Sequence, residues 1–213
     1  MSTIAKIFKI FDLPTGNRKF FKNFYGNHDS KADWMRRFNA VITVLILVLF
    51  LIHAFLGAFM MMDVTANTYK ITARACATLT IIHALIGLWL TGKSLWICHK
   101  TGAPYFKENQ LYWARRISGL LIMVLIFFHS GSFTDHIGGI FQLKPFNTAR
   151  LIIQILFILS LALHIISNVR PMLISLGIKK LRPHQGKILF ILSIILLFFT
   201  AAFIIYYLHW QSM

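Results

Sequence analysis

Four histidines lie inside long apolar stretches of this 213-residue chain, one in each of four successive stretches. An ionisable side chain is costly inside hydrocarbon, so its presence there marks a functional site by default. A lone histidine in such a stretch is usually a hydrogen-bonded core residue, but four of them favour a shared task. Imidazoles that act in pairs from facing helices are typical ligands of haem iron. The four are His53, His83, His129 and His164.

Their depths sort the histidines into two layers. At about 1.5 Å rise per residue from the nearest basic residue, His53 lies about 24 Å and His129 about 20 Å from the basic side. His83 lies about 15 Å and His164 about 9 Å from that side. We expect each layer to hold one six-coordinate, low-spin iron without an open position, which suits electron transfer. Two such centres at different depths would carry electrons across a bilayer that one cofactor cannot span.

The elements that must position these residues are transmembrane helices. Hydrophobic residues make up 57% of the chain and its mean hydropathy is +0.68, whereas soluble domains are about 45–50% apolar. Crossing a bilayer core of about 30 Å takes roughly 20 helical residues. We therefore predict an all-α integral membrane bundle of five transmembrane helices over residues 38–208, with no soluble catalytic domain. The five runs are Phe38–Met61, Ile71–Thr91, Trp113–Phe133, Ala149–Ser175 and Gly186–Leu208.

The basic residues predict the orientation of the bundle. Of the 22 Lys and Arg residues, 18 lie in the N-terminal segment and in the second and fourth connections. The positive-inside rule then places the N-terminus in the cytoplasm and the C-terminus outside. We expect a multi-pass protein of the cell inner (cytoplasmic) membrane. The net charge of +16 is explained by this distribution, without a nucleic-acid partner.

The remaining segments are predicted to be peripheral. Residues 1–37 would be a cytoplasmic segment that begins with a short interfacial helix, because Ile4, Ile7, Phe8 and Phe11 recur at helical spacing between lysines. Residues 100–109 would form a turn and residues 130–147 a solvated outer loop. Residues 209–213 would form a short outer tail.

Other histidine chemistries fit less well. A proton-coupled transporter usually carries Asp or Glu within the membrane, but all six acids lie in loops or at span ends. A zinc site needs ligands that converge closely, which two separate layers do not supply. Covalent haem attachment needs a second cysteine, yet Leu95 stands three residues before Cys98. Any haem would be held non-covalently, and the two cysteines are interpreted as structural. The acids are Asp12, Asp29, Asp33, Asp63, Glu108 and Asp135.

Two further sets of residues have open interpretations. Gly57 and Gly87 each follow a histidine by four residues, and would either leave room for a large planar ligand or allow close helix packing. Basic residues near the span ends would either bind haem propionates or anchor the helices at the interface. These are Lys93 and Arg170 on the inner side and Lys70, Arg74 and Arg150 on the outer side.

The arrangement resembles the dihaem cytochrome b membrane anchor of succinate dehydrogenases and fumarate reductases. The resemblance covers about residues 34–208. It rests on five spans with one histidine in each of the first four, on Arg116-x-Ser118-Gly119, and on the stretch from His164 to Arg170 followed by Leu176-Gly177. Nitrate reductase and hydrogenase cytochromes b also have four or five helices, but typically place two ligands on one helix.

The resemblance implies two b haems, with His83 and His164 on the proximal iron and His53 and His129 on the distal iron. It also implies a cytoplasmic flavoprotein subunit with FAD, an iron–sulfur subunit and a quinone, often menaquinone. The chain would then be an electron-transfer subunit with no catalytic residues for the dicarboxylate. Some relatives use an intramembrane glutamate for proton transfer. This chain has none in a span, and Asp63, Asp135 and His136 are the nearest outer candidates.

Two other classes stay open from the sequence. The chain could be the dihaem cytochrome b of another quinone-linked oxidoreductase, of the hydrogenase or heterodisulfide-reductase type. It could also be a transporter or a haem-free structural anchor, which would be colourless when purified.

Overall fold

The computed structural model describes residues 30–62, 70–101, 110–137, 140–178 and 183–212. Residues 37–213 form one compact unit, which holds the five long helices apart from the first residues of α3. The expected interfacial helix within residues 1–11 and Asp63 lie outside the described residues. Of the turn predicted at residues 100–109, the first two residues belong to helix α4 (Lys70–Thr101) instead, and residues 102–109 lie outside the described residues.

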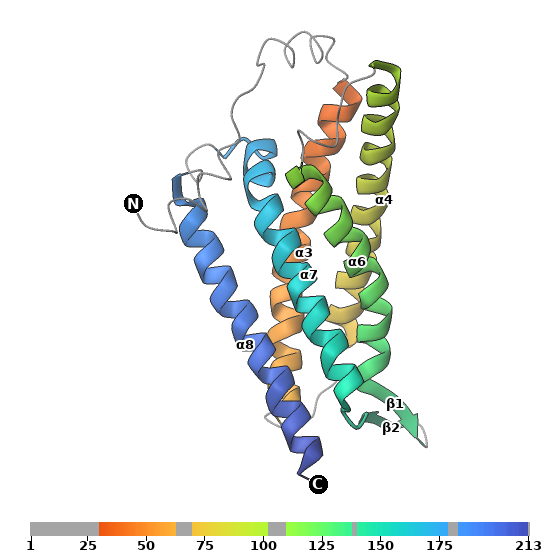
Figure 1. The fold of residues 1–213 in the computed structure, drawn as a ribbon, viewed down its shortest axis with the longest axis vertical. Coiled ribbons are helices and arrows are strands. Elements are labelled where there is room, and N and C mark those ends of the chain that lie inside the picture. Colours follow the sequence, from red (N-terminus) through yellow and green to blue (C-terminus); the bar gives the residue numbers. More distant parts are fainter. Residues whose placement is uncertain (1–29, 63–69, 102–109, 138–139, 179–182, 213) are drawn as a thin grey trace. The chain divides into compact units, whose positions relative to one another are not determined.

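Five helices and one short hairpin make up the described chain (Figure 1). Successive helices run in alternating directions, and the hairpin joins α6 to α7. Strand β1 pairs antiparallel with β2, with Thr134 opposite Leu143. The elements are α3 (Ser30–Met61), α4 (Lys70–Thr101), α6 (Gln110–Phe133), β1 (Thr134–Ile137), β2 (Ile140–Leu143), α7 (Thr148–Ser175) and α8 (Gln185–Gln211).

The five predicted spans coincide with these helices, but the helices are longer at several ends. Helix α3 begins eight residues before Phe38, and α4 continues ten residues beyond Thr91. Hydropathy marks only the apolar section of a helix, whereas the backbone hydrogen bonds continue into polar sequence. For the same reason α8 includes most of the predicted tail, up to Gln211. The segment expected to be a loop at residues 130–147 contains the end of α6 and the hairpin, with Asp135 and His136 on β1.

Helix α7, which carries His164, is fixed at both ends. At its start the side chain of Asn147 accepts a hydrogen bond from the backbone N–H of Arg150 at 3.0 Å, as an N-cap residue does. At its end Gly177 adopts φ +72°, and the N–H of Ile178 donates to the carbonyl of Leu173 at 3.0 Å. This Schellman arrangement needs a residue that tolerates a left-handed backbone. Local hydrogen bonds therefore determine where α7 begins and where it ends.

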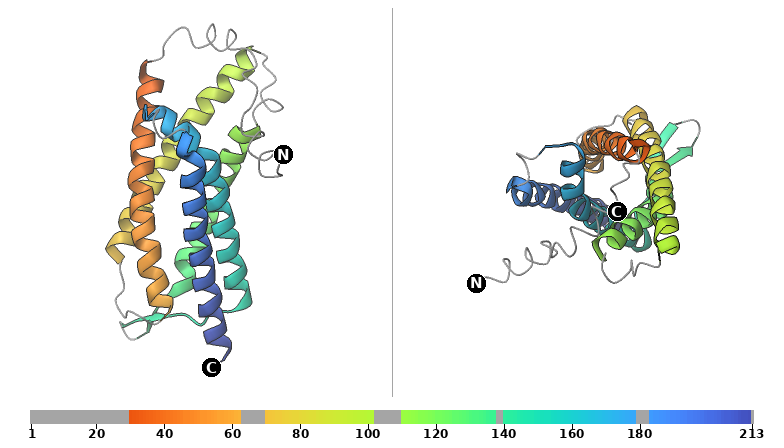
Figure 2. Two further views of the ribbon diagram at one scale, coloured as in Figure 1. Left: turned by 90° about the vertical axis from the view of Figure 1, so that its left-hand side faces the viewer. Right: turned by 90° about the horizontal axis from the view of Figure 1, so that it is seen from above.

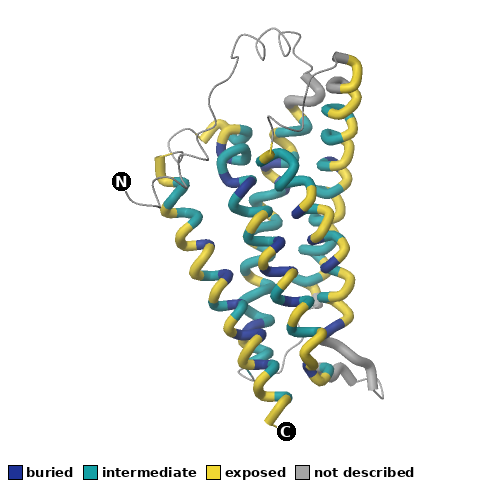
Figure 3. Tube along the Cα trace, viewed as in Figure 1, coloured by how far each residue is buried: buried dark blue, intermediate teal, exposed yellow. Residues whose placement is uncertain are grey.

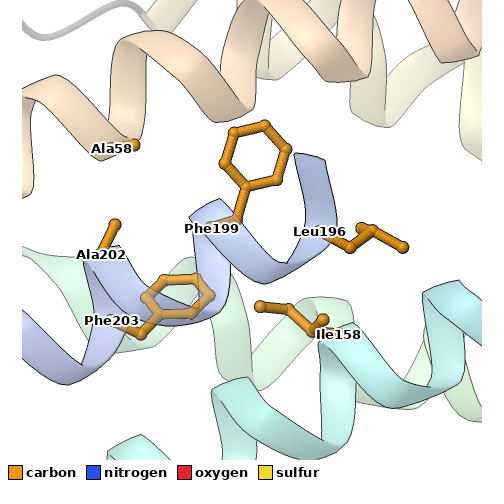
Figure 4. Packing of buried hydrophobic residues seen from close by; sticks show 6 residues of the cluster. All are labelled: Ala58, Ile158, Leu196, Phe199, Ala202 and Phe203. Carbon is orange, nitrogen blue, oxygen red and sulfur yellow. The ribbon is translucent and has the colours of Figure 1, made fainter. Parts of the chain in front are cut away.

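The largest apolar cluster holds α8 against α3 and α7 (Figure 4). Phe199, Ala202 and Phe203 of α8 pack with Ala58 of α3 and Ile158 of α7. Ala58 is fully buried and Ala202 is 1% exposed, so small residues let the helices approach closely there. Helix α8 carries no histidine inside its span and acts as a packing element.

Every long helix has exposed residues along its length (Figure 3), and many of these exposed residues are large and apolar. Phe127 is 75% exposed and Leu197 is 67% exposed, whereas soluble monomers rarely expose contiguous apolar surface of this extent. All five helices are long and apolar enough to cross a membrane. The prediction of a five-helix, multi-pass membrane protein is thus confirmed, and its orientation stays a prediction.

The helix backbones approach one another unequally. The extensive close contacts among the described helices are those of α6 with α7 and of α7 with α8. Helices α3 and α4 make only sparse close backbone contacts with other helices. Viewed along the bundle, α3, α4 and α6 lie around a common centre, and the C-terminal end of α8 lies near that centre in the same view (Figure 2). Helix α8 packs against α3 and α7.

Candidate haem sites

The structure brings the four histidines together as two pairs, each of which joins two different helices. His53 of α3 lies beside His129 of α6, with their ring centroids 6.2 Å apart and an angle of 77° between the ring planes. His83 of α4 lies beside His164 of α7, also at 6.2 Å and with an angle of 87°. We refer to them as the α3–α6 pair and the α4–α7 pair. They are the same pairs that the depth count gives from the sequence.

The common spacing matches the requirement of two axial ligands. An imidazole–metal bond measures about 2 Å, and the ring centroid lies about 1.2 Å behind the bonded nitrogen. Two imidazoles on opposite sides of one metal ion therefore hold their centroids about 6.3 Å apart. Rings in direct contact also span about 4.5–7 Å. The hydrogen bonds of the rings must therefore decide whether ligating nitrogens are available.

In the α4–α7 pair, a threonine of α3 fixes the ring of His83. The hydroxyl of Thr43 donates its single proton to the carbonyl of Asn39 at 2.8 Å. Its oxygen lies 3.3 Å from Nδ1 of His83, and can only accept there, because a hydroxyl has one proton to give. Nδ1 of His83 consequently carries the proton.

The partner ring, His164, is held by the start of α6. Its Nδ1 lies 3.2 Å from the carbonyl of Arg115 and 3.2 Å from Oγ of Ser118. Ser118 donates to the Arg115 carbonyl at 3.1 Å and is 1% exposed. Both neighbours therefore accept from Nδ1–H. A Cβ on Gly119 would lie 3.2 Å from Cε1 of His164, so any side chain at this position would press against the ring and require it to shift by a few tenths of an ångström.

In the α3–α6 pair, α7 fixes the ring of His129. Oε1 of Gln154 lies 2.7 Å from Nδ1 of His129, and Phe157 stacks on the ring at 4.9 Å. Gln154 is fully buried. The other member, His53, has no hydrogen bond to its ring within the described part of the chain. One ring of this pair is held by hydrogen bonding and stacking, and the other only by packing.

These bonds select the tautomer that a metal ligand needs. Three of the four rings give their Nδ1–H to an acceptor on the chain, which leaves Nε2 unprotonated. Metal-binding histidines nearly always donate their second nitrogen in this way. His83, His129 and His164 are therefore in the tautomer that a metal ligand needs.

Three helices place the two pairs at the same separation along the bundle. Ten residues separate Gln154, which contacts one pair, from His164 in the other, and ten also separate Thr43 from His53. Eleven separate Ser118 from His129. At 1.5 Å per residue the layers are about 15 Å apart, which is half of a bilayer core of about 30 Å.

A half-buried guanidinium, that of Arg116, lies next to the α4–α7 pair. Nη1 of Arg116 donates to the carbonyl of Gly87 at 3.2 Å, one turn after His83, and the group lies over the ring of Tyr112 at 4.9 Å. Its Nε is buried and donates to no acceptor among the described residues. None of the five spans contains an acidic residue. The donor set therefore fits an external carboxylate, such as a haem propionate.

The glycines and basic residues that the sequence singled out have different surroundings. A Cβ on Gly57 would meet nothing within 4 Å, whereas one on Gly87 would meet Nη1 of Arg116 at 3.3 Å. Gly57 thus faces open space, and Gly87 makes room for a guanidinium. Lys93 lies over Trp89 of its own helix, and Arg150 donates to the carbonyl of Pro145. Arg116 is therefore a better propionate candidate than these two.

The sequence did not reveal the residues that hold the rings. Gln154 carries a signal that could have been used, since a carboxamide inside an apolar run needs a partner. Thr43 carries none, because hydroxyl residues in such helices commonly bond to their own backbone, as Thr200 does.

No group of three or more His, Cys, Asp or Glu side chains within the described ranges could hold a metal ion. Bis-imidazole ligation of haem requires only two, because the porphyrin supplies the other four nitrogens. No family model matches the chain, and neither a curated protein nor a solved structure matches it.

Proposed function

We propose that this chain is a dihaem cytochrome b: a membrane subunit that transfers electrons between a soluble module and quinone. The observation that carries the proposal is the presence of two equivalent histidine pairs, both at 6.2 Å, with Nδ1 protons directed to acceptors on the chain. Bound between such imidazoles, haem supplies reversible one-electron transfer at an iron without an open position.

The chain's own residues would hold and orient the two groups. His53 and His129 would ligate the distal haem, and His83 and His164 the proximal haem. Arg116 and the open space beside Gly57 would accommodate the periphery of the macrocycles. The apolar helices exclude water from both sites, and a low dielectric strengthens the electrostatic influence of Arg116 on its neighbours.

The proposed partner follows from the resemblance and from the charges. Basic residues gather at one end of the described bundle, because the up-and-down helices bring Arg37, Lys93, Arg116, Arg170 and Lys187 to that end. This end, oriented to the cytoplasm, would dock an iron–sulfur subunit and an FAD flavoprotein of a succinate dehydrogenase or fumarate reductase. The quinone, menaquinone by the same resemblance, would react in the inner membrane domain.

The first test is optical. We expect the dithionite-reduced-minus-oxidised spectrum of the purified protein to show b-type haem, and the pyridine haemochrome assay to give two haems per chain. A folded protein that is expressed with haem available and remains colourless would refute the proposal. It would favour a haem-free anchor or a transporter.

A second test concerns the partner. Affinity purification from the native membrane should recover a flavoprotein and an iron–sulfur protein, together with quinone-linked succinate or fumarate turnover. Recovery of a hydrogenase or heterodisulfide-reductase module instead would support the alternative dihaem cytochrome b and refute the dicarboxylate assignment.

A further inference from the structure

Gln154 is a fully buried carboxamide in a helix that otherwise offers apolar side chains at this depth. It lies on the turn of α7 that faces α6, three residues before Phe157, and both residues contact the ring of His129. Burying a carboxamide in hydrocarbon is unfavourable unless its hydrogen bonds are made. A fully buried glutamine at this position must therefore make an interaction that offsets the cost of its burial.

The two ends of the carboxamide have unequal partners. Oε1 lies 2.7 Å from Nδ1 of His129, but Nε2 donates to no acceptor among the described residues. Leaving a hydrogen bond of a buried polar group unmade is unfavourable, and an apolar residue would avoid that cost. The hydrogen bond of Oε1 to His129 is therefore the interaction that distinguishes this side chain from an apolar one.

The direction of the carboxamide decides which nitrogen of His129 can bind a metal. With Oε1 toward the ring, Nδ1 carries the proton and Nε2 is unprotonated. In the reverse direction the –NH₂ group would donate to Nδ1, and the proton would move to Nε2 and block ligation. Phe157, stacked on the ring at 4.9 Å, prevents the ring from turning to escape this choice.

We infer that Gln154 is a positioning residue for the α3–α6 pair, which selects the ligating tautomer of His129 and tunes the haem bound there. The inference rests on the proposed function and adds a determinant of redox potential to it. A hydrogen bond from Nδ1–H makes the imidazole a stronger donor to iron, and so favours the oxidised state. Because His53 has no such bond within the described chain, Gln154 is the main control of ligand strength in this pair.

The test compares Gln154→Met, Gln154→Asn and Gln154→Glu with the wild type by potentiometric titration of the purified protein. Methionine removes the acceptor, asparagine keeps the amide but withdraws its oxygen by one methylene, and glutamate keeps an oxygen at full length. The control is Ser160→Ala, which removes another buried polar group of α7 that bonds only to its own helix, at the carbonyl of Leu156. The component that His129→Leu abolishes identifies the α3–α6 haem.

We expect the Met and Asn variants to retain two haems and to shift the midpoint potential of the α3–α6 component upward. Haem transfer from that site to apomyoglobin should become about 10-fold to 100-fold faster, as for lost second-shell partners elsewhere. The Glu variant should restore both values toward the wild type, and Ser160→Ala should change neither.

Wild-type values in both the Met and the Asn variant would overturn the inference, as would an equal shift in all three Gln154 variants. If the Met variant does not fold, the Asn and Glu variants decide in the same way. These failures differ from failure of the proposed function, in which the wild-type protein itself binds no haem.

Discussion

The two histidine pairs share their internal geometry and differ in their surroundings. Both have ring centroids 6.2 Å apart and nearly perpendicular ring planes. The α4–α7 pair is surrounded by a hydroxyl, a serine–carbonyl acceptor and the guanidinium of Arg116, whereas the α3–α6 pair has one carboxamide and an aromatic ring. Equal ligands in unequal environments give unequal redox potentials. Under the proposed function, the paired histidines would hold the two haems, and the residues around each pair would set the difference between their redox potentials.

The two pairs also differ in what holds them. The rings of the α4–α7 pair are fixed by α3 and α6, and the ring of His129 is fixed by α7. Each pair is thus positioned by helices whose own histidines belong to the other pair. Helix α7 serves both pairs, through Gln154 and His164, and it is also the helix with the most extensive close packing.

Removal of one histidine should abolish the haem of its own pair and leave the haem of the other pair in place. We expect His164→Leu and His83→Leu to lose the same haem, so that haem per chain falls by half, and to leave the other component spectrally recognisable. His53→Leu and His129→Leu should lose the other. Haem quantification with a redox titration of each variant measures this. Loss of one common component in the His164 and His53 variants would show that the pairing is incorrect.

Gly119 should affect only the α4–α7 pair. A valine would place branched methyl groups where a Cβ alone already lies 3.2 Å from His164, so we expect loss of the haem of that pair. Gly131→Ala on the same helix is the matched control, because a Cβ there meets nothing within 4 Å, and it should retain two haems. A Gly119→Val protein with both haems and unchanged spectra would contradict the packing of His164 against α6.

The charge of Arg116 should distinguish the pairs electrostatically. A nearby cation stabilises the reduced iron, so Arg116→Gln should lower the midpoint potential of the α4–α7 component by on the order of 60 mV, equivalent to about 1.4 kcal/mol for one electron. Arg37→Gln removes an exposed charge at the same end of the bundle and should have little effect. An equal change of both components in the Arg116 variant would show that its field is not local.

The smallest effect is expected at Thr43. Thr43→Val keeps the shape of the side chain and removes the acceptor 3.3 Å from His83, a contact worth about 1 kcal/mol. We expect a slight rise in the potential of the α4–α7 component, smaller than the shift of the other component in Gln154→Met. Thr200→Val changes the same residue type on α8, where the hydroxyl donates to the carbonyl of Leu196 in its own helix, and should match the wild type. A larger shift in midpoint potential in Thr43→Val than in Gln154→Met would contradict the proposed relative strength of the two hydrogen bonds.

The sequence alone determined the membrane-spanning architecture. Five apolar runs of sufficient length require helices, because in lipid every backbone polar group must be satisfied within its own segment. It also determined which histidines lie at equal depth, since helical rise converts residue number into distance along the axis. Helix ends were less accurate: hydropathy does not register the polar residues through which α3 and α4 continue, nor the hairpin between α6 and α7.

Only the tertiary structure decided what surrounds each ring. The sequence gives the depth of each histidine along its helix. It does not give the rotation of each helix about its own axis, because that rotation is set by packing between helices. That rotation brings Gln154 to His129, Thr43 to His83 and Gly119 to His164, across 25 to 45 residues of chain. It also turns Arg116, rather than Lys93, toward the α4–α7 pair. The four candidate histidines and their pairing could be predicted from residue type and depth, whereas the residues that fix the tautomer of each ring depend on the helices being packed together.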